Sequence, residues 1–326
     1  MKKLIFCAGF GYTGSGAVLD MLSEVNNVHV MANEFRVLAD PDGLLSLRRS
    51  LTRDWSLYGA DRALNRFERM IKKTSSISFG PYALLDHTKE FRGLYVDLSK
   101  EFVSQLSSGD YRGYWYGNDN LLLRLINSRW FFGKFSTGIF KKRMRIVPYL
   151  DKKEFDKKAQ AYIQKLAAAA TNKTTFCFDE GFIALHCCEL LEMIPDSKLI
   201  LTIRNPKDVI ATTTSLGWNA NPDKLSMQIE WLYSTYNRWM QIAETQSPQK
   251  VLVVKLEDMV NEYERTKKRI FEYLQIEDIG HLKKYDKFDP AVSKQNVNIA
   301  EAILSNNDIK EIDTKFFEIN QYFKYR

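Results

Sequence analysis

Four glycines follow the first apolar run of the chain at a spacing that suits a turn around an anion. The run is Lys3–Ala8, and the glycines are Gly9, Gly11, Gly14 and Gly16. Glycine supplies the positive φ angles and the close backbone approach that a tight strand-to-helix turn requires. From Ala17 onward apolar side chains recur at helical spacing, so we predict that a helix begins near Ser15. The N–H groups of its first turn would then face a bound phosphate or sulfate.

Three kinds of nucleotide site can be built on this turn. The first three glycines spell G-x-G-x-x-G and Glu34 follows at the end of a second apolar run, as in dinucleotide-binding proteins. Residues 9–15 also fit the spacing of a triphosphate-binding loop, but Ser15 stands where the lysine should be, which weakens that interpretation. The third possibility is a phosphosulfate-binding loop, whose last three positions would be residues 13–15. A purely structural turn is the remaining alternative.

A second anion site is predicted in residues 199–215, where a strand ends in Arg204 and Pro206 opens a helix. The guanidinium group of an arginine offers a fork of donors to a phosphate. Thr212 lies eight positions after Arg204, two turns into the helix, and can add a hydroxyl on the same face. Neither a dinucleotide site nor a kinase site requires a strand-Arg-Asn-Pro-helix unit. The alternative is a structural arginine at the edge of the sheet.

These two units together resemble the sulfotransferase superfamily, which uses 3′-phosphoadenosine 5′-phosphosulfate (PAPS) as sulfuryl donor and releases 3′-phosphoadenosine 5′-phosphate (PAP). The resemblance implies that residues 11–17 hold the 5′-phosphosulfate and that the unit from Arg204 through Asp208 to Thr212 holds the 3′-phosphate. Residues 251–259 are similar to a later strand and helix of the family, and 286–298 to its nucleotide-covering loop. The implied cofactor-binding residues are Gly11, Tyr12, Thr13, Gly14, Ser15, Gly16, Ala17, Arg204, Thr212 and Lys294.

The chain departs from the family pattern at two places. Tyr12 occupies the loop position where the family commonly has a lysine or arginine. The histidine base of the cytosolic branch has no counterpart, whereas the glycosaminoglycan-modifying branch uses a glutamate in a context similar to residues 33–35. The resemblance therefore makes Glu34 the candidate catalytic base, with His87 in reserve. The alternative for Glu34 is a surface carboxylate paired with Arg36.

The alternation of apolar runs and helical patterns predicts one α/β domain over residues 1–326, with helices on both faces of a parallel sheet. This agrees with the P-loop-like sulfotransferase fold that the resemblance implies. The expected strands are 3–8, 28–32, 175–178, 198–203 and 251–254, and the expected helices among them are 182–193, 206–215, 223–244 and 258–274. Residues 40–172 form a helical insertion on the acceptor side, with helices over 62–72, 90–106 and 153–170. Residues 286–298 lack periodicity and are expected to be a loop.

Composition narrows the functional classes. The 326 residues are 45% hydrophobic and carry a net charge of +7, which suits anionic ligands or reflects a solvated lysine-rich exterior. The 4 cysteines show no C-x-x-C spacing, so we expect reduced core residues and a cytoplasmic protein. The apolar start is expected to be a strand and not a signal peptide, because it breaks at Gly9. No apolar run approaches the roughly 18 residues of a membrane span.

Residues 111–145 combine aromatic and basic side chains. They form either a solvated face beside a core cluster or a groove for sugar rings or an anionic surface, which would include peripheral membrane contact.

The sequence as a whole predicts a PAPS-dependent sulfotransferase that acts on a hydroxyl of a carbohydrate or glycolipid, without a metal and without a nucleic-acid partner. The loop N–H groups, the hydroxyls of Thr13 and Ser15 and the helix N-terminus would stabilise the sulfuryl oxygens. Two alternatives stay open. One is an NAD- or FAD-binding oxidoreductase, from the glycines and Glu34, and the other is a catalytically silent nucleotide-binding module, suggested by Tyr12.

Overall fold

The computed structural model describes residues 1–9, 11–77, 85–113, 142–217 and 225–325. Its main sheet has the strand order β2-β5-β1-β6-β7, and every neighbouring pair is parallel. The strands are β1 (Lys3–Ala8), β2 (Val28–Val30), β5 (Thr175–Asp179), β6 (Lys198–Ile203) and β7 (Val251–Lys255). Because β1 lies between β5 and β6, the loops after these three strands meet at one edge of the sheet.

The central strand divides the core into two halves. Leu4, Phe6 and Ala8 belong to the larger hydrophobic cluster, while Ile5 and Cys7 belong to the smaller one. This alternation follows from the period of two along a strand, and it leaves β1 apolar on both faces. The smaller cluster is closed by α1 (Ser15–Ser23), α12 (Leu256–Asn261) and α13 (Tyr263–Leu274).

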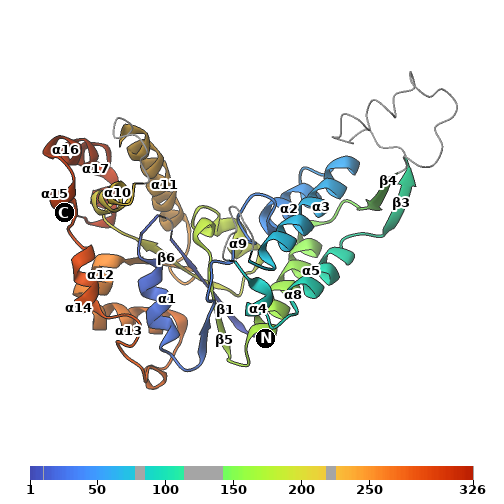
Figure 1. The fold of residues 1–326 in the computed structure, drawn as a ribbon, viewed down its shortest axis with the longest axis horizontal. Coiled ribbons are helices and arrows are strands. Elements are labelled where there is room, and N and C mark those ends of the chain that lie inside the picture. The colour runs from blue at the N-terminus through green and yellow to red at the C-terminus, as the bar shows by residue number, and fades with distance from the viewer. Residues whose placement is uncertain (10, 78–84, 114–141, 218–224, 326) are drawn as a thin grey trace.

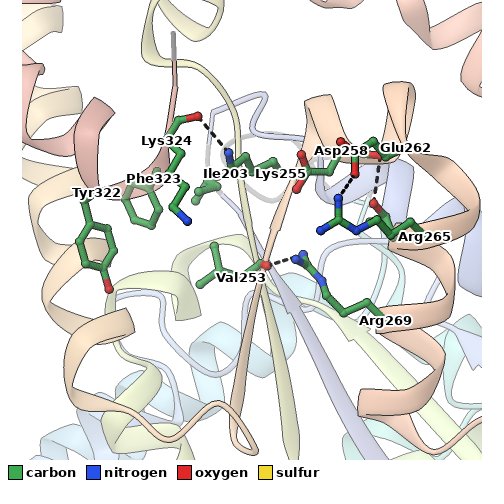
Figure 2. A pocket seen from close by; sticks show the side chains of 11 residues that line it. Ile203, Val253, Lys255, Asp258, Glu262, Arg265, Arg269, Tyr322, Phe323 and Lys324 are labelled. Atoms are coloured by element: carbon green, nitrogen blue, oxygen red, sulfur yellow. Dashed lines mark hydrogen bonds and ion pairs between the residues drawn. The ribbon is translucent and has the colours of Figure 1, made fainter.

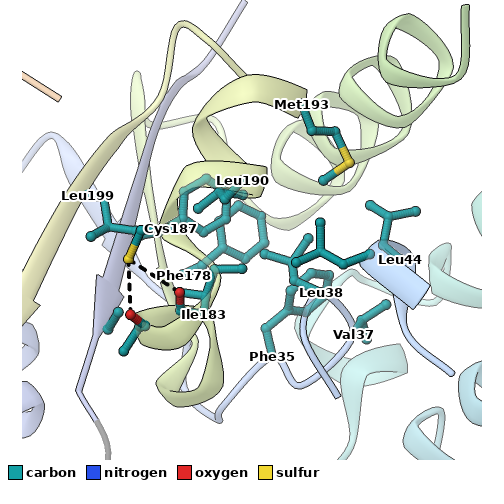
Figure 3. Close-up of a cluster of buried hydrophobic side chains, with 14 of the residues drawn as sticks. Phe35, Val37, Leu38, Leu44, Phe178, Ile183, Cys187, Leu190, Met193 and Leu199 are labelled. Carbon is teal, nitrogen blue, oxygen red and sulfur yellow. Dashed lines mark hydrogen bonds between the residues drawn. The ribbon is translucent and has the colours of Figure 1, made fainter. Parts of the chain in front are cut away.

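The larger cluster is closed by α9 (Cys187–Met193), α10 (Pro206–Ser215) and α11 (Leu225–Thr245) together with the insertion. Figure 3 shows part of it, with Phe35 and Phe178 packed between the sheet and the segment around Leu38. The ring centroids of Phe35 and Phe178 are 4.9 Å apart. This packing holds the chain that follows β2 against the end of β5.

The described part of the insertion between β2 and β5 is mainly helical and lies on one side of the sheet in Figure 1. Its helices are α2 (Leu44–Thr52), α3 (Leu57–Thr74), α4 (His87–Glu90), α5 (Tyr95–Ser104) and α8 (Lys152–Ala170). The insertion also contains an antiparallel pair that the sequence analysis did not predict, β3 (Gly109–Gly113) with β4 (Lys142–Ile146). Most of the aromatic and basic segment predicted at 111–145 lies outside the described residues.

The chain after β7 returns to the edge of the sheet where the loops after β1, β5 and β6 meet. After α13 come a 3₁₀ turn (Asp278–Gly280), α14 (Pro290–Ser293), a 3₁₀ turn (Lys294–Asn296), α15 (Ala300–Ile303), α16 (Asn306–Lys315) and α17 (Phe317–Phe323). The prediction of a loop over 286–298 is therefore corrected, since two short helical turns form there. Such short turns bury few apolar side chains and leave no periodic pattern to detect.

Three predicted helices are interrupted. The helix expected over 258–274 is two helices that meet at Glu262, whose φ of −130° is not helical. The one expected over 182–193 starts as a 3₁₀ helix (Gly181–Leu185) and restarts after His186. The one expected over 90–106 breaks between α4 and α5, where Arg92 and Gly93 have positive φ angles. These breaks depend on single backbone angles, which hydrophobic spacing does not report.

Three of the four cysteines are buried and all four are free. Among the residues that the structure describes, no helix has the length and apolarity needed to cross a bilayer.

Candidate active site

The turn between β1 and α1 has the backbone of an anion cradle. Gly11, Tyr12 and Gly14 have φ angles of 71°, 66° and 97°, all in the left-handed region. Successive residues of this kind bring neighbouring N–H groups to one concave side of the chain. Gly14 is the N-cap of α1, and no side chain caps the N–H groups there. The first turn of the helix therefore offers its N–H groups to a ligand.

The glycines of this turn serve different purposes. A Cβ atom at Gly9 would overlap the hydroxyl of Thr202, and one at Gly14 would lie 2.9 Å from Cβ of Leu256. At Gly16, in contrast, no atom of the described residues lies within 4 Å of the position of a Cβ, apart from its chain neighbours and the backbone of α1. Open space therefore adjoins the first turn of α1, where a ligand can approach the backbone.

The hydroxyl of Thr13 does not line this cradle, which corrects the prediction that it supplies a donor there. Thr13 is buried, and its Oγ1 lies 3.4 Å from Oγ1 of Thr202 on β6. The hydroxyl of Thr202 in turn donates to the carbonyl oxygen of Ala8. Thr13 therefore ties the turn to the sheet, while Ser15 and Gly16 remain at the surface of the cradle.

Arg204 connects the two predicted anion-binding units. It follows β6, is only 3% exposed, and its Nη1 donates to the carbonyl oxygen of Tyr12 at 3.3 Å. The same nitrogen donates to Oγ1 of Thr212 at 2.9 Å. The prediction that Arg204 and Thr212 lie on the same face is therefore confirmed. Burial lowers the pKa of Arg204 from its usual value. Its buried Nε has no acceptor among the described residues.

The segment that contains Lys294 is fastened over Arg204. The carbonyl oxygen of Asn296 accepts a hydrogen bond from Nη2 of Arg204 at 2.7 Å. The buried carboxylate of Asp208 accepts the N–H groups of the three residues 298–300 at 2.7 to 3.1 Å. Lys294 itself is exposed, one helical turn from this contact. The structure thus brings Arg204, Thr212 and the backbone near Lys294 to one place.

Glu34 lies on the other side of β1, beside the end of β5. Its Oε1 accepts the N–H of Gly181 at 3.1 Å, and its Oε2 lies 3.5 Å from Nη1 of Arg36. A Cβ atom at Gly181 would be 2.6 Å from Oε1 of Glu34 and 3.3 Å from the carbonyl oxygen of Gly9. The carboxylate of Glu34 therefore lies beside Gly181 and near Gly9, although β5 separates β2 from β1.

Two further carboxylates lie at this corner, and the sequence analysis missed both. Burial, and secondarily the charge of Glu34, raises the pKa of Asp179 to about 7. Glu180 is fully buried, and burial raises the pKa of its carboxyl group well above the usual value. A sequence signal for them exists, because both residues directly follow the apolar run 175–178. Ligands of open α/β sheets bind at the carboxyl ends of such strands.

His87 has no access to a substrate in this structure. Its side chain is 0% exposed and packs against the rings of Phe35, Phe91 and Tyr95. Its Nε2 lies 2.8 Å from the carbonyl oxygen of Phe35, and burial lowers its pKa to about 4. We therefore remove His87 from the candidate bases, since a neutral core histidine serves packing.

The order of the strands argues against the dinucleotide interpretation. In the dinucleotide-binding fold the strand that carries the acidic residue lies next to the strand that precedes the glycines. Here β5 separates β2 from β1, so the strand before Glu34 is not the neighbour of β1 that this role requires. The chain thus has the G-x-G-x-x-G spacing of a dinucleotide site without the strand order of the dinucleotide-binding fold.

A cavity of about 460 Å³ lies elsewhere, at the free edge of β7 (Figure 2). Three of the cations that line it are held by neighbouring protein atoms. Arg269 donates to the carbonyl oxygen of Val253, and Lys255 donates to that of Lys324. Arg265 pairs with Glu262 at 2.6 Å. These contacts cover an edge strand that would otherwise expose unpaired backbone groups. None of the predicted site residues lines this cavity.

Comparison with known proteins supports the fold. A model of a sulfotransferase family matches residues 137–279, which include β6, α10 and Arg204. The sulfotransferase domain from the curacin biosynthetic pathway has a TM-score of 0.52 at 11% identity, covering 100% of this chain and 99% of that one. This likeness confirms the predicted fold, a parallel sheet flanked by helices as in sulfotransferases. The family match supports the resemblance to the sulfotransferase superfamily that the sequence analysis stated.

Two other solved structures are similar at the level of the whole chain. The sulfotransferase domain of the olefin synthase from Synechococcus PCC 7002 has a TM-score of 0.48 at 12% identity and covers 97% of this chain and 94% of that one. A sulfotransferase from Mycobacterium avium has a TM-score of 0.45 at 13% identity, with coverages of 100% and 78%. No curated protein gives a significant match to this sequence.

Proposed function

We propose that this protein transfers a sulfuryl group from PAPS to a hydroxyl of a carbohydrate or glycolipid acceptor. The observation that carries the proposal is the contact between Arg204 and the carbonyl oxygen of Tyr12. It joins a glycine-rich anion cradle to a buried arginine at the end of the neighbouring strand. PAPS bears two anionic groups, a 5′-phosphosulfate and a 3′-phosphate, and the two units offer one site for each.

The residues present fit such a donor. Arg204 keeps a buried Nε without an acceptor among the described residues, and open space adjoins Gly16 at the N-terminus of α1. Residues 11–17 would hold the 5′-phosphosulfate, and Arg204, Thr212 and Lys294 would hold the 3′-phosphate. PAPS supplies the sulfuryl group when bound, and the protein supplies position and charge.

The chain contributes three effects to the transfer. The N–H groups of the turn and of the first turn of α1 stabilise negative charge on the sulfuryl oxygens. The fixed backbone of the turn orients the donor for in-line attack by the acceptor hydroxyl. A carboxylate at this edge of the sheet accepts the hydroxyl proton, and the family resemblance makes Glu34 one candidate for it. A carbohydrate or glycolipid acceptor is proposed because a glutamate after the second strand resembles the glycosaminoglycan-modifying branch.

A thermal-shift comparison of PAP, NAD and ATP tests the proposed donor. A ligand that binds only the folded state, at 100 times its dissociation constant, stabilises it by about 2.7 kcal/mol. We expect that PAP gives such a shift and that NAD gives none. Equal stabilisation by NAD and PAP would contradict the sulfotransferase proposal, and stabilisation by ATP alone would favour a triphosphate site.

A further inference from the structure

We propose that Asp179, and not Glu34, takes the proton from the acceptor hydroxyl, and that Glu34 is the residue that positions and tunes it. This inference rests on the proposed sulfuryl transfer. It adds a catalytic residue that neither the motifs nor the family resemblance supplied.

Asp179 lies next to the strand that leads into the cradle. It is the last residue of β5 and pairs in register with Cys7, two positions before Gly9. The N–H of Glu180 donates to the carbonyl oxygen of Cys7 at 3.1 Å, so β5 follows β1 to the start of the turn. The N–H of Phe35 donates to the carbonyl oxygen of Asp179 at 2.7 Å, which fixes the chain beside Glu34 to the same point.

The direction of the side chain also suits the role. Side chains alternate along a strand, so Asp179 shares the face of Cys177 and not that of Phe178. Cys177 belongs to the cluster closed by α1, whereas Phe178 belongs to the opposite one. The carboxylate of Asp179 therefore lies on the face of the sheet that α1 covers, at the end where that helix begins.

The three carboxylates of this corner differ in their hydrogen bonds. Glu34 accepts the N–H of Gly181 and pairs with Arg36. Glu180 is buried, and its Oε2 accepts the N–H of Leu38 at 3.4 Å. Asp179 is half-buried, and no donor among the described residues lies within hydrogen-bond distance of its carboxylate. An accessible carboxylate without donors is free to accept a proton from a substrate.

The surroundings give Asp179 a basicity suited to neutral pH. Burial, and then the negative charge of Glu34, raises its pKa to about 7. The other titratable groups that face it are the thiols of Cys7 on β1 and Cys177 on β5, whose pKa values are raised by burial, so both stay neutral. A base with a pKa near the working pH combines a useful ionised fraction with a strong pull on the proton.

The arrangement separates donor from acceptor. Arg204 follows β6 on one side of β1, and Asp179 ends β5 on the other. With the 3′-phosphate at Arg204, the sulfuryl end of the donor reaches the cradle near Asp179. The acceptor oxygen then forms a bond to sulfur while the bond from sulfur to the 5′-phosphate oxygen breaks. The hydroxyl proton moves to a carboxylate oxygen of Asp179, and the bonding electron pair leaves with PAP.

The test compares Asp179→Asn, Glu34→Gln and, as a matched surface control, Asp196→Asn. Binding is measured by calorimetry with PAP. Transfer is measured with radiolabelled PAPS, both to galactosylceramide vesicles and, without vesicles, to water. We expect Asp179→Asn to bind PAP within about threefold of wild type and to lose about 10² to 10⁴ in transfer rate.

Glu34→Gln has a distinct expected signature. Removing its negative charge lowers the pKa of Asp179, so the acid limb of the pH-rate profile moves to lower pH while transfer persists. Near wild-type transfer by Asp179→Asn, or a greater loss in Glu34→Gln than in Asp179→Asn, would overturn the inference. Loss of PAP binding in Asp179→Asn would also overturn it, because the residue would then support the donor site. Absence of PAP binding in wild type would instead contradict the proposed function itself.

Discussion

The Oδ2 atom of Asp208 accepts the N–H of Asn298 at 2.7 Å, across 90 positions of sequence. Its Oδ1 accepts the N–H groups of Ile299 and Ala300. Asp208 lies in the first turn of α10, one turn before Thr212, so a single buried carboxylate holds the C-terminal segment against the Arg204 site. The acidic position of the strand-Arg-Asn-Pro-helix unit thus has a structural purpose here, separate from any contact with a nucleotide.

We expect Asp208→Asn to weaken both folding and PAP binding. An amide has one acceptor oxygen instead of two, and its NH₂ group would face N–H groups that need an acceptor. Hydrogen bonds to a charged group are worth about 1.5 to 3 kcal/mol each, so a loss of unfolding free energy in that range is expected. Chemical denaturation and calorimetry with PAP measure the two effects. Asp313→Asn, which removes a more exposed ion pair with Lys207, serves as control.

Arg204→Ala tests the division of the donor site into two anion sites. We expect the variant to lose about 1.5 to 3 kcal/mol in PAP binding, the value of a charge-assisted contact, and much less with adenosine 5′-phosphosulfate, which lacks the 3′-phosphate. Calorimetry with both ligands measures the difference, and Arg204→Lys is the charge-preserving control. An equal loss for the two ligands would make Arg204 a structural residue that holds the carbonyl groups of Tyr12 and Asn296.

The elements beside β1 could be predicted from the sequence because each has a local signal. The bounds of β1, β6 and α10 agree with their predicted ranges. The two strands are apolar on both faces and end at polar residues or glycine, and α10 has its proline in the first turn. Arg204 and Thr212 could likewise be paired, since the helical period alone sets their relative positions.

Asp179 and Thr13 could not be assigned in this way. The role of Asp179 depends on which strand lies next to β1, and strand order is a tertiary property that no local pattern reports. The direction of the Thr13 hydroxyl depends on Thr202, which is 189 positions away. Glu34 was the candidate base instead because residues 33–35 resemble the context of the base in the glycosaminoglycan-modifying branch.

The pKa of Asp179 predicts how its variant changes stability with pH. The pKa is raised from 3.8 to about 7 on folding, so between these values the folded state binds more protons than the unfolded state. Stability therefore falls as the pH rises through this window. We expect Asp179→Asn to be as stable as wild type at about pH 4 and more stable by at least about 1.4 kcal/mol at about pH 8.

Urea denaturation at several pH values measures this difference, with Asp196→Asn as the exposed control. A stability difference that does not change with pH would show that the two residues differ in packing and not in ionisation. In that case the pH dependence of sulfuryl transfer would need another titrating group.

Gly16→Ala is expected to change the unfolding free energy and the PAP affinity in opposite directions. Gly16 is the second residue of α1, and a Cβ there would enter open space. Alanine is favoured over glycine in a helix, so we expect the variant to gain about 0.4 to 1 kcal/mol in unfolding free energy. The added methyl would stand where the donor approaches the first-turn N–H groups. PAP affinity should therefore fall at least about tenfold, which is about 1.4 kcal/mol.

Gly14→Ala is the contrasting variant. Gly14 has a φ of 97° and its Cβ would lie 2.9 Å from Leu256, so this change should destabilise the fold as well as weaken binding. Thermal denaturation and calorimetry with PAP distinguish the two patterns. A Gly16→Ala protein that is more stable and still binds PAP with wild-type affinity would place the nucleotide away from the N-terminus of α1. Because the cradle and the Arg204 unit are joined through Tyr12, that result would contradict the whole donor site and not one contact.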